Sequence, residues 1–302
     1  MADATHKFLD PKVLNKITRL DLKARHIVEG FMGGMHKSPY HGFSVEFAEH
    51  REYAPGDDLK HLDWKVFGRS DRLFIKEYEL ETNLRTHILL DTSESMDYGG
   101  RETTKLELAS HIAASMAYLI LRQQDSVGMV CFDKEVKTFI PTSSSMGHLR
   151  PILGTLAQSE GKNKTDLGAV LNTLAERIQR RGLIILISDL FDKPDVILKS
   201  LQHFSHKRHD VIVFHVLDEY ELTFPFDRMT LFEGLEDYPK QLIDPRSLRK
   251  AYLAEVNQFC EDMRKGCGRQ RIDYVRISTD QDLDVQLTKY LAGRLSIRGK
   301  LT

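Results

Sequence analysis

The sequence predicts an α/β protein built on a doubly wound, mostly parallel sheet of six strands. From about residue 86 onward, short apolar runs of strand length alternate with longer amphipathic stretches. This alternation is typical of parallel strands joined by helices that cover both faces of a sheet. The chain has 302 residues, of which 41% are hydrophobic, so it can bury a sizeable core.

Six apolar runs are the expected strands. In chain order they span residues 86–91, 127–132, 135–140, 183–188, 211–217 and 272–278. The connection between the second and third runs, DKE, is too short for a parallel crossover. The third strand should therefore return antiparallel to the second and lie at an edge of the sheet.

Six longer stretches with helical periodicity are the expected helices. They span residues 105–124, 148–158, 166–180, 194–207, 246–265 and 282–298. The first begins with a capping box, because Thr104 precedes Glu107 by three positions. Residues 222–245 contain three prolines and short alternating pieces, which favour an inserted hairpin or an irregular excursion between the fifth strand and the fifth helix.

The texture changes before residue 86, which predicts two parts. Residues 1–85 are expected to form a small α+β extension, with a helix around residues 10–32 and short strands around a turn. Residues 86–302 are expected to form the main domain.

The net charge of the chain is -1, so the sequence shows no strong excess of basic residues. This argues against a nucleic-acid-binding protein.

The compartment is predicted from cysteine usage and from the lack of a leader pattern. The first residues show no cationic segment followed by an apolar one, and no apolar run is long enough to span a bilayer. The three cysteines, Cys131, Cys260 and Cys267, are few and odd in number, which favours unpaired thiols in the core. We therefore expect a soluble, cytoplasmic protein without a membrane span.

Oxygen-bearing side chains gather at the ends of the first and fourth strands. Asp91 ends the first strand, and Ser93 and Ser95 follow it on the next loop. If the strand order is 3-2-1-4-5-6, the fourth strand neighbours the first, and Asp189 then faces the same crevice. Thr165 opens the helix that precedes the fourth strand. The five side chains offer hard oxygens, which suit Mg²⁺ or Mn²⁺ better than zinc.

This constellation resembles the metal-ion-dependent adhesion site (MIDAS) of von Willebrand factor A domains. The resemblance rests on the D-x-S-x-S run from Asp91 to Ser95, on Thr165 and on Asp189, and extends over roughly residues 86–298. It implies a Rossmann-like fold and a magnesium site completed by waters or by a carboxylate of another molecule. The sequence departs from the family at NKT, where glycines more often precede the threonine.

Two enzymatic alternatives start from the same residues. Asp91 could be the nucleophile of a Mg²⁺-dependent phosphatase similar to the haloacid-dehalogenase-like enzymes, but those resemble D-x-D, and position 93 is Ser. A serine hydrolase is disfavoured because the chain has no G-x-S-x-G elbow and His111 has no evident orienting partner. We expect no catalytic residue and no enzymatic activity.

A second signature, REYAPGDDLKHLDW, spans residues 51–64. It resembles the hallmark of the bacterial domain of unknown function 58 family, which joins this segment to an A-like domain. The residues that carry the resemblance are Arg51, Tyr53, Pro55, Gly56, Asp57, Asp58, Asp63 and Trp64. From the residues themselves we expect a turn at Pro55 and Gly56, a brace anchored by Trp64, and no catalytic pair of aspartates.

The family resemblance implies a function. It implies a metal-dependent protein-interaction module that works with a MoxR-type AAA+ ATPase, as an adaptor in protein remodelling or metal-cofactor insertion. The chain has no P-loop, so ATP hydrolysis would come from that partner. A scaffold whose oxygens bind no ion is the remaining possibility.

Overall fold

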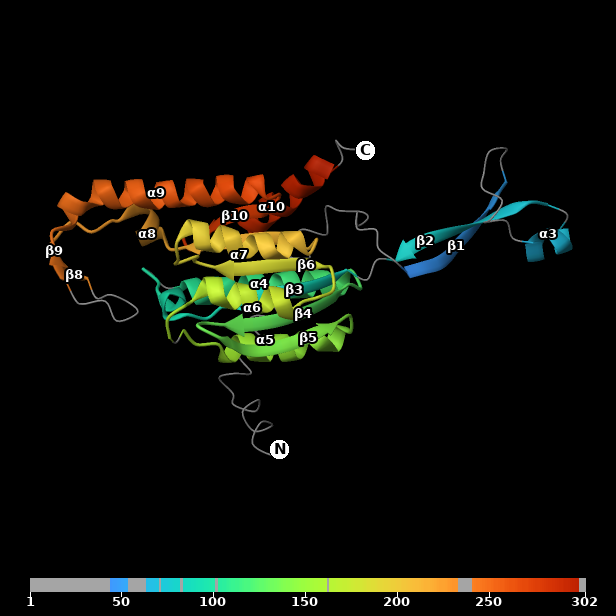
Figure 1. Ribbon diagram of the computed structural model, residues 1–302, viewed down its shortest axis with the longest axis horizontal. Helices are drawn as coiled ribbons and strands as arrows, with labels where there is room; N and C mark the ends of the chain where they lie inside the picture. Colours follow the sequence, from blue (N-terminus) through green and yellow to red (C-terminus); the bar gives the residue numbers. More distant parts are fainter. Residues whose placement is uncertain are drawn as a thin grey trace, which may run out of the picture. The chain divides into compact units, whose positions relative to one another are not determined.

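The computed structural model describes residues 44–53, 64–70, 72–81, 84–100, 103–161, 163–232 and 241–298 (Figure 1). The contacts divide the chain into two compact units, one within Lys37–Leu84 and one that includes Arg85–Thr302. The helix expected around residues 10–32 lies outside the described residues.

The larger unit is built on a six-stranded sheet. Its strands are β3 (Arg85–Asp91), β4 (Ser126–Phe132), β5 (Val136–Ser143), β6 (Leu183–Ser188), β7 (Asp210–Leu217) and β10 (Asp273–Ser278). Their spatial order is β10-β7-β6-β3-β4-β5. Counted from β3 as the first strand, this is the predicted order 3-2-1-4-5-6. The pairs are parallel except β4 with β5, so the predicted antiparallel edge strand is confirmed.

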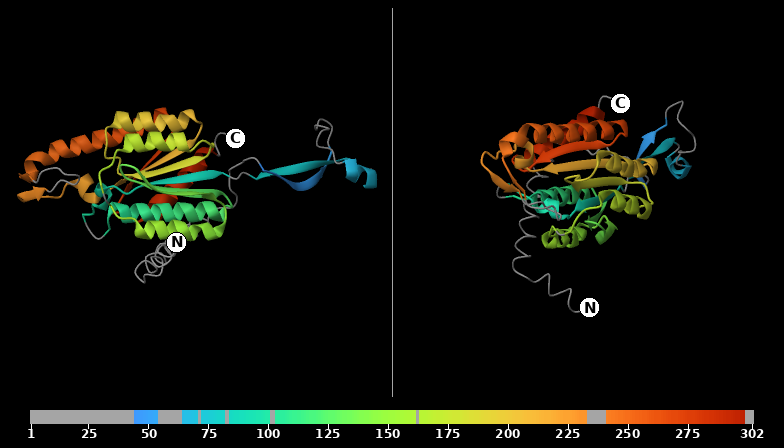
Figure 2. Two further views of the ribbon diagram at one scale, coloured as in Figure 1. Left: turned by 60° about the horizontal axis from the view of Figure 1, so that its bottom comes forward. Right: turned by 60° about the vertical axis from the view of Figure 1, so that its left-hand side comes forward.

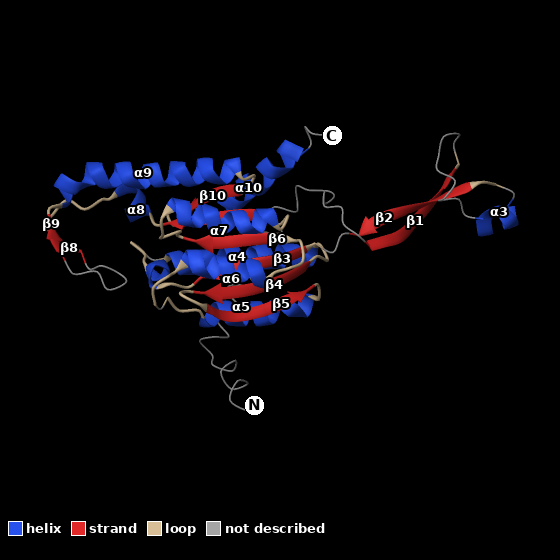
Figure 3. Ribbon diagram, viewed as in Figure 1, coloured by secondary structure: helices blue, strands red, loops and turns tan. Residues whose placement is uncertain are grey.

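Helices cover both faces of this sheet, as the predicted fold class requires. They are α4 (Lys105–Arg122), α5 (Leu149–Gln158), α6 (Leu167–Arg177), α7 (Pro194–His206), α8 (Glu219–Thr223), α9 (Pro245–Arg269) and α10 (Leu283–Arg298). Figure 2 shows α6, α7 and α9 on one face and α4 and α5 on the other. Figure 3 distinguishes the strands of the sheet, in red, from the helices that cover it, in blue.

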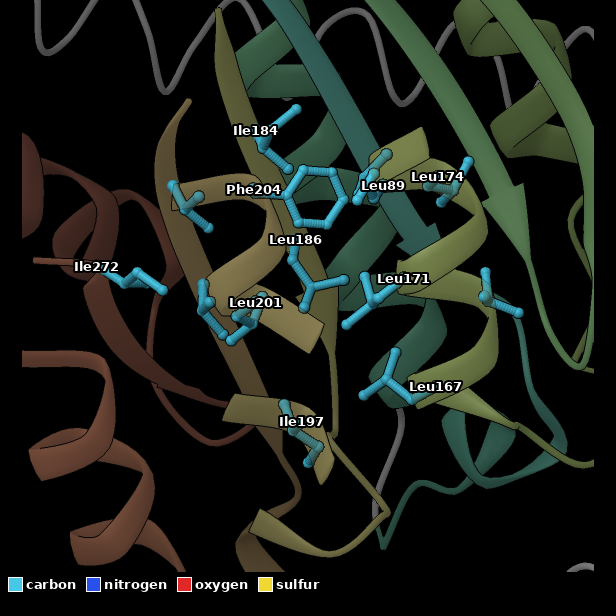
Figure 4. Packing of buried hydrophobic residues seen from close by; sticks show 14 of the residues in the cluster. Leu89, Leu167, Leu171, Leu174, Ile184, Leu186, Ile197, Leu201, Phe204 and Ile272 are labelled. Atoms are coloured by element: carbon cyan, nitrogen blue, oxygen red, sulfur yellow. The ribbon is translucent and has the colours of Figure 1, made fainter. Parts of the chain in front are cut away.

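The core lies between the sheet and these helix layers. Strand residues of one face, such as Leu89 and Leu186, pack against Leu171 of α6 and Phe204 of α7, and all four are fully buried (Figure 4). β3 and β6 are buried along almost their whole length, because helices cover both of their faces. The carboxyl ends of the central strands are therefore fixed on a rigid frame.

The segment expected to hold a hairpin contains two short strands, β8 (Thr230–Phe232) and β9 (Gln241–Ile243), which pair antiparallel. Phe232 stacks on Phe224 with ring centroids 5.7 Å apart and meets Phe226 edge-on at 5.3 Å. The cross-strand pair Leu231 and Leu242 is exposed. One face of the hairpin thus packs on aromatic rings, and the other offers apolar side chains to solvent.

The smaller unit pairs β1 (Ser44–Glu52) with β2 (Phe74–Glu81) in an antiparallel ribbon, with the short helix α3 (Trp64–Ser70) between them in the chain. Trp64 is 66% exposed and meets Phe67 edge-on at 6.2 Å, so it does not bury its ring as the predicted anchor would. The predicted turn at Pro55 and Gly56, with Asp57, Asp58 and Asp63, lies outside the described residues.

Candidate metal centre

The candidate centre lies at the carboxyl edge of the two central strands. Asp91 is the last residue of β3, and Asp189 directly follows β6. β3 and β6 are parallel neighbours, so both carboxylates leave the sheet at the same edge. Both residues are buried.

Hydrogen bonds fix the Asp91 carboxylate from two sides. Its Oδ1 accepts the backbone N–H of Ser93 at 3.0 Å and the hydroxyl of Thr165 at 3.3 Å. Its Oδ2 accepts the hydroxyl of Ser188, the last residue of β6, at 2.6 Å. The carboxylate therefore joins β3, the loop after it, the start of α6 and the end of β6.

The hydroxyls continue this network toward Asp189. Ser93 and Ser95 place their Oγ atoms 3.1 Å apart, and the Ser95 side chain acts to lower the pKa of Asp189. The backbone N–H of Glu94 donates to the carbonyl of Asn163 at 2.9 Å, which ties the loop after β3 to the segment that carries Thr165. The structure thus brings Asp91, Ser93, Ser95 and Thr165 into one hydrogen-bonded group. Asp189, the fifth residue selected from the sequence, lies at the same sheet edge, at the end of the neighbouring strand β6.

The two aspartates differ in their electrostatic surroundings. Burial, together with the charge of Asp189, raises the pKa of Asp91 to about 7, although the hydrogen bonds from Ser188 and Ser93 act in the opposite direction. Burial alone also raises the pKa of Asp189, but the ammonium of Lys105 outweighs it and holds that pKa below its usual value. Asp91 is therefore the carboxylate whose negative charge lacks a compensating cation.

The donor set fits a small divalent cation. Magnesium binds oxygen ligands at about 2.1 Å in octahedral geometry, so neighbouring ligand oxygens lie ~3.0 Å apart. The Ser93 and Ser95 hydroxyls are separated by 3.1 Å, and the Thr165 hydroxyl lies 3.3 Å from Asp91 Oδ1. Asp91 would supply the uncompensated charge. Among the described residues no group of three His, Cys, Asp or Glu side chains has ligand geometry, so a site here depends on its hydroxyls.

Sequence reasoning missed a buried cation beside this group. Lys105, the first residue of α4, donates to Asp189 Oδ2 at 2.8 Å and to Glu221 Oε1 of α8 at 2.7 Å, and its side chain is 3% exposed. Burial lowers the pKa of Lys105, but the two carboxylates raise it above its usual value. A lysine at the start of an apolar helix is unfavourable with respect to the helix dipole. That unusual position is the sequence signal that could have indicated a paired, buried cation.

Glu221 belongs to a second polar cluster on α8. Its Oε2 accepts the backbone N–H of Asp218 at 2.8 Å, and Asp218 in turn caps α8 as a capping box. Asp218 Oδ2 accepts the hydroxyl of Thr279, which follows β10, at 2.7 Å. The polar network therefore runs along the sheet edge from β3 to β10.

His215 supports the backbone at Asp189 from within the sheet. Its Nε2 lies 3.0 Å from the Asp189 carbonyl oxygen, and its Nδ1 contacts the Tyr274 hydroxyl. Burial lowers the pKa of His215 to about 4, so the ring is neutral at pH 7. A neutral ring can donate one N–H to the carbonyl while it accepts from tyrosine.

The three cysteines form no second centre. Cys131, Cys260 and Cys267 are buried and unpaired, as the sequence predicted. Burial raises the pKa of Cys131 and of Cys267 to about 12, which keeps both thiols protonated. They act as core side chains.

Comparisons with known proteins place the chain among relatives without assigned function. A family model described as "Protein of unknown function DUF58" matches residues 49–261. The uncharacterized protein Rv1480 of Mycobacterium tuberculosis (strain H37Rv) is 26% identical over 293 residues, which covers 94% of this chain and 90% of that protein. The solved von Willebrand factor A (VWA) domain of SpRpn10 is similar in fold, with a TM-score of 0.39 and 10% identity over 67% of this chain and 92% of that chain.

The predicted cytoplasmic location is contradicted by another similar structure. An aerotolerance-related membrane protein from Bacteroides fragilis has a TM-score of 0.45 and 18% identity, over 70% of this chain and 97% of that chain. The prediction rested on cysteine usage and on the lack of a leader pattern, and cysteine usage reports the redox environment without information on attachment to a membrane. Within the described residues, no helix has the length and apolarity needed to cross a bilayer.

Proposed function

The chain belongs to the DUF58 family, as the signature at residues 51–64 predicted, and on that premise we propose that it is a non-catalytic protein-interaction module that depends on a divalent cation. The observation that carries the proposal is the convergence of two carboxylates and three hydroxyls at one sheet edge. Mg²⁺, or Mn²⁺ in its place, is the cation that this donor set suits.

Each residue of the centre would have a distinct task. Ser93, Ser95 and Thr165 would ligate the cation through neutral hydroxyls. Asp91 would supply the charge that retains it, because the charge of Asp189 is already shared with Lys105. When bound, the cation would offer a further coordination position to a carboxylate from outside the chain. A centre with few charged ligands leaves that position attractive to an acidic side chain.

The surface beside the centre suits a protein ligand. Phe191, two residues after Asp189, is 60% exposed. An exposed aromatic ring next to a cation site can contact apolar residues that flank the partner's acidic side chain. We propose that this partner is an acidic side chain of a client or of a MoxR-type AAA+ ATPase, with the present chain as an adaptor in protein remodelling or metal-cofactor insertion. The ATPase is proposed on the family resemblance alone.

Calorimetry tests the cation requirement. The full chain should bind Mg²⁺ or Mn²⁺ with measurable heat, and Asp91→Ala should abolish that heat while the circular dichroism spectrum stays native. Equal heats for both proteins would overturn the metal centre and leave a scaffold without an ion.

Affinity capture tests the partner. The tagged chain should recover an AAA+ ATPase from a native bacterial lysate in the presence of Mg²⁺, and chelator or Asp91→Ala should prevent recovery. Recovery that is indifferent to chelator would argue against a cation-dependent interface. Phosphate release from generic phosphate esters that Asp91→Asn abolishes would overturn the non-catalytic proposal.

A further inference from the structure

Lys105 occupies a position that ordinary helix chemistry disfavours. It is the first residue of α4, where the unpaired backbone N–H groups give the helix end a partial positive charge. Burial of an ammonium group adds a desolvation cost that only close, hydrogen-bonded counter-charges offset. Here the counter-charges are Asp189 and Glu221, at 2.8 and 2.7 Å.

The same contact limits what Asp189 can offer to a cation. Lys105 occupies Asp189 Oδ2, while Oδ1 makes a 3.4 Å contact with the backbone N–H of Phe191. A divalent cation that uses Asp189 therefore meets an ammonium group already placed on that carboxylate. The two positive charges repel each other in a buried region, where screening by water is weak.

We propose that Lys105 is a built-in competitor of the divalent cation, which sets how tightly the centre binds it. The inference rests on the proposed function and concerns the regulation of the same centre. Without the cation, Lys105 bridges Asp189 and Glu221. With the cation bound, Asp189 turns toward the cation and the ammonium relies on Glu221. Glu221 is then the residue that makes cation binding possible, because it retains the displaced positive charge.

The exchange connects the centre to the hairpin through α8. Glu221 lies on α8, and Phe224, which ends that helix in a left-handed conformation, stacks on Phe232 of β8. A stronger pull of Lys105 on Glu221 therefore acts on the element that positions the hairpin. The exposed Leu231 and Leu242 are on that hairpin. Helix α8 therefore connects the cation centre to an exposed apolar surface.

Titration calorimetry with MgCl₂ on the full chain tests the proposal through the sign of two effects. Lys105→Gln removes the competing charge and should raise the Mg²⁺ affinity about tenfold or more, as loss of a nearby charge in a medium of effective dielectric constant ~20 predicts. Glu221→Gln removes the group that accepts the ammonium and should lower the affinity by about the same factor. Lys265→Gln, an exposed lysine paired with Glu261 on α9, is the matched control and should leave the affinity unchanged.

A purely structural role for Lys105 predicts the opposite sign, because a disturbed centre binds more weakly. Unchanged or lower Mg²⁺ affinity of a natively folded Lys105→Gln would overturn the inference. The proposal of a metal centre would still stand in that case if the wild type binds Mg²⁺. If the wild type and Lys105→Gln both gave no heat, the inference and the metal centre would fail together. Should Lys105→Gln not fold, Lys105→Met and Glu221→Gln replace it, and unchanged affinity in Glu221→Gln also overturns the inference.

Discussion

The hydroxyl of Ser188 donates a 2.6 Å hydrogen bond to Asp91 Oδ2, although the two residues are 97 positions apart in the chain. The same Ser188 oxygen accepts the backbone N–H of Leu190 at 2.9 Å. One oxygen of Asp91 is therefore bound by the scaffold, and the other faces Ser93 and Thr165. The two sides of this carboxylate are separable by substitution.

We expect Thr165→Val to weaken Mg²⁺ binding about tenfold, because it removes one ligand hydroxyl and keeps the shape of the side chain. The free energy of unfolding should change by less than ~0.5 kcal/mol, since the 3.3 Å bond to Asp91 is long. Calorimetry and urea unfolding measure the two effects. Thr173→Val, on the exposed side of α6, is the control.

Ser188→Ala should show the reverse balance. It leaves the buried N–H of Leu190 without its acceptor, at a cost of roughly 1–2 kcal/mol in the free energy of unfolding. Cation affinity should change less than in Thr165→Val. A larger loss of affinity in Ser188→Ala would mean that the scaffold side of Asp91 governs binding.

Asp189→Asn should destabilise the protein in the absence of any divalent cation. The substitution leaves the buried Lys105 ammonium with Glu221 as its remaining carboxylate partner, and broken buried ion pairs cost several kcal/mol. Because Glu221 remains, we expect a loss of about 2–3 kcal/mol in urea unfolding with chelator present. Asp262→Asn, an exposed aspartate of α9, should stay within ~0.5 kcal/mol of wild type. A neutral Asp189→Asn would contradict the ion pair.

Acid should destabilise the protein through His87. Burial, with the charges of His209 and Arg85, lowers the pKa of His87 from 6.5 to about 4. Between these values the unfolded chain binds a proton that the folded chain rejects, so stability falls as the pH drops from 6.5 toward 4. The loss from this group reaches up to about 3 kcal/mol.

Urea unfolding as a function of pH measures this dependence. His87→Leu should flatten the profile between pH 6.5 and 4, and the exposed His203→Gln should not. Equal profiles for wild type and His87→Leu would show that other groups, such as the buried His215, account for acid sensitivity.

The two faces of the hairpin should respond differently to truncation. Phe232→Ala removes a ring packed on Phe224 and Phe226 and should lower the free energy of unfolding by about 2 kcal/mol, less than for a fully buried phenylalanine. Leu231→Ala, on the exposed face, should change it by less than ~0.5 kcal/mol. Thermal or urea unfolding measures both, and equal losses would contradict the described packing.

The order of the strands and the group around Asp91 were predictable from sequence. Parallel strands of a doubly wound sheet end at one edge. The strand order 3-2-1-4-5-6 therefore places Asp91, at the end of β3, beside Asp189, which follows β6. The antiparallel return of β5 followed from a connection too short for a crossover. These inferences need only local pattern and general rules of topology.

Lys105 and Glu221 were not predictable in the same way. Lys105 lies 84 positions from Asp189 and 116 positions from Glu221. Its place at a helix start marks it as unusual, but nothing local in the chain indicates which carboxylates it contacts. Ser188 is a single hydroxyl-bearing residue in an apolar strand sequence, and one such residue does not indicate a contact with Asp91. The location of Glu221 depends on α8, which lies between β7 and the hairpin. This helix has five residues and is too short for helical periodicity to reveal it.

The central place of β3 determines which parts of the centre can rearrange. Its backbone is hydrogen-bonded to β4 on one side and β6 on the other, so amide protons near Asp91 should exchange with deuterium only on global unfolding. The five-residue helix α8 has no such double ladder. Hydrogen–deuterium exchange should therefore be fast at Glu221 and slow at Leu89. The part of the centre that can rearrange is then α8, which carries Glu221, the second carboxylate partner of Lys105.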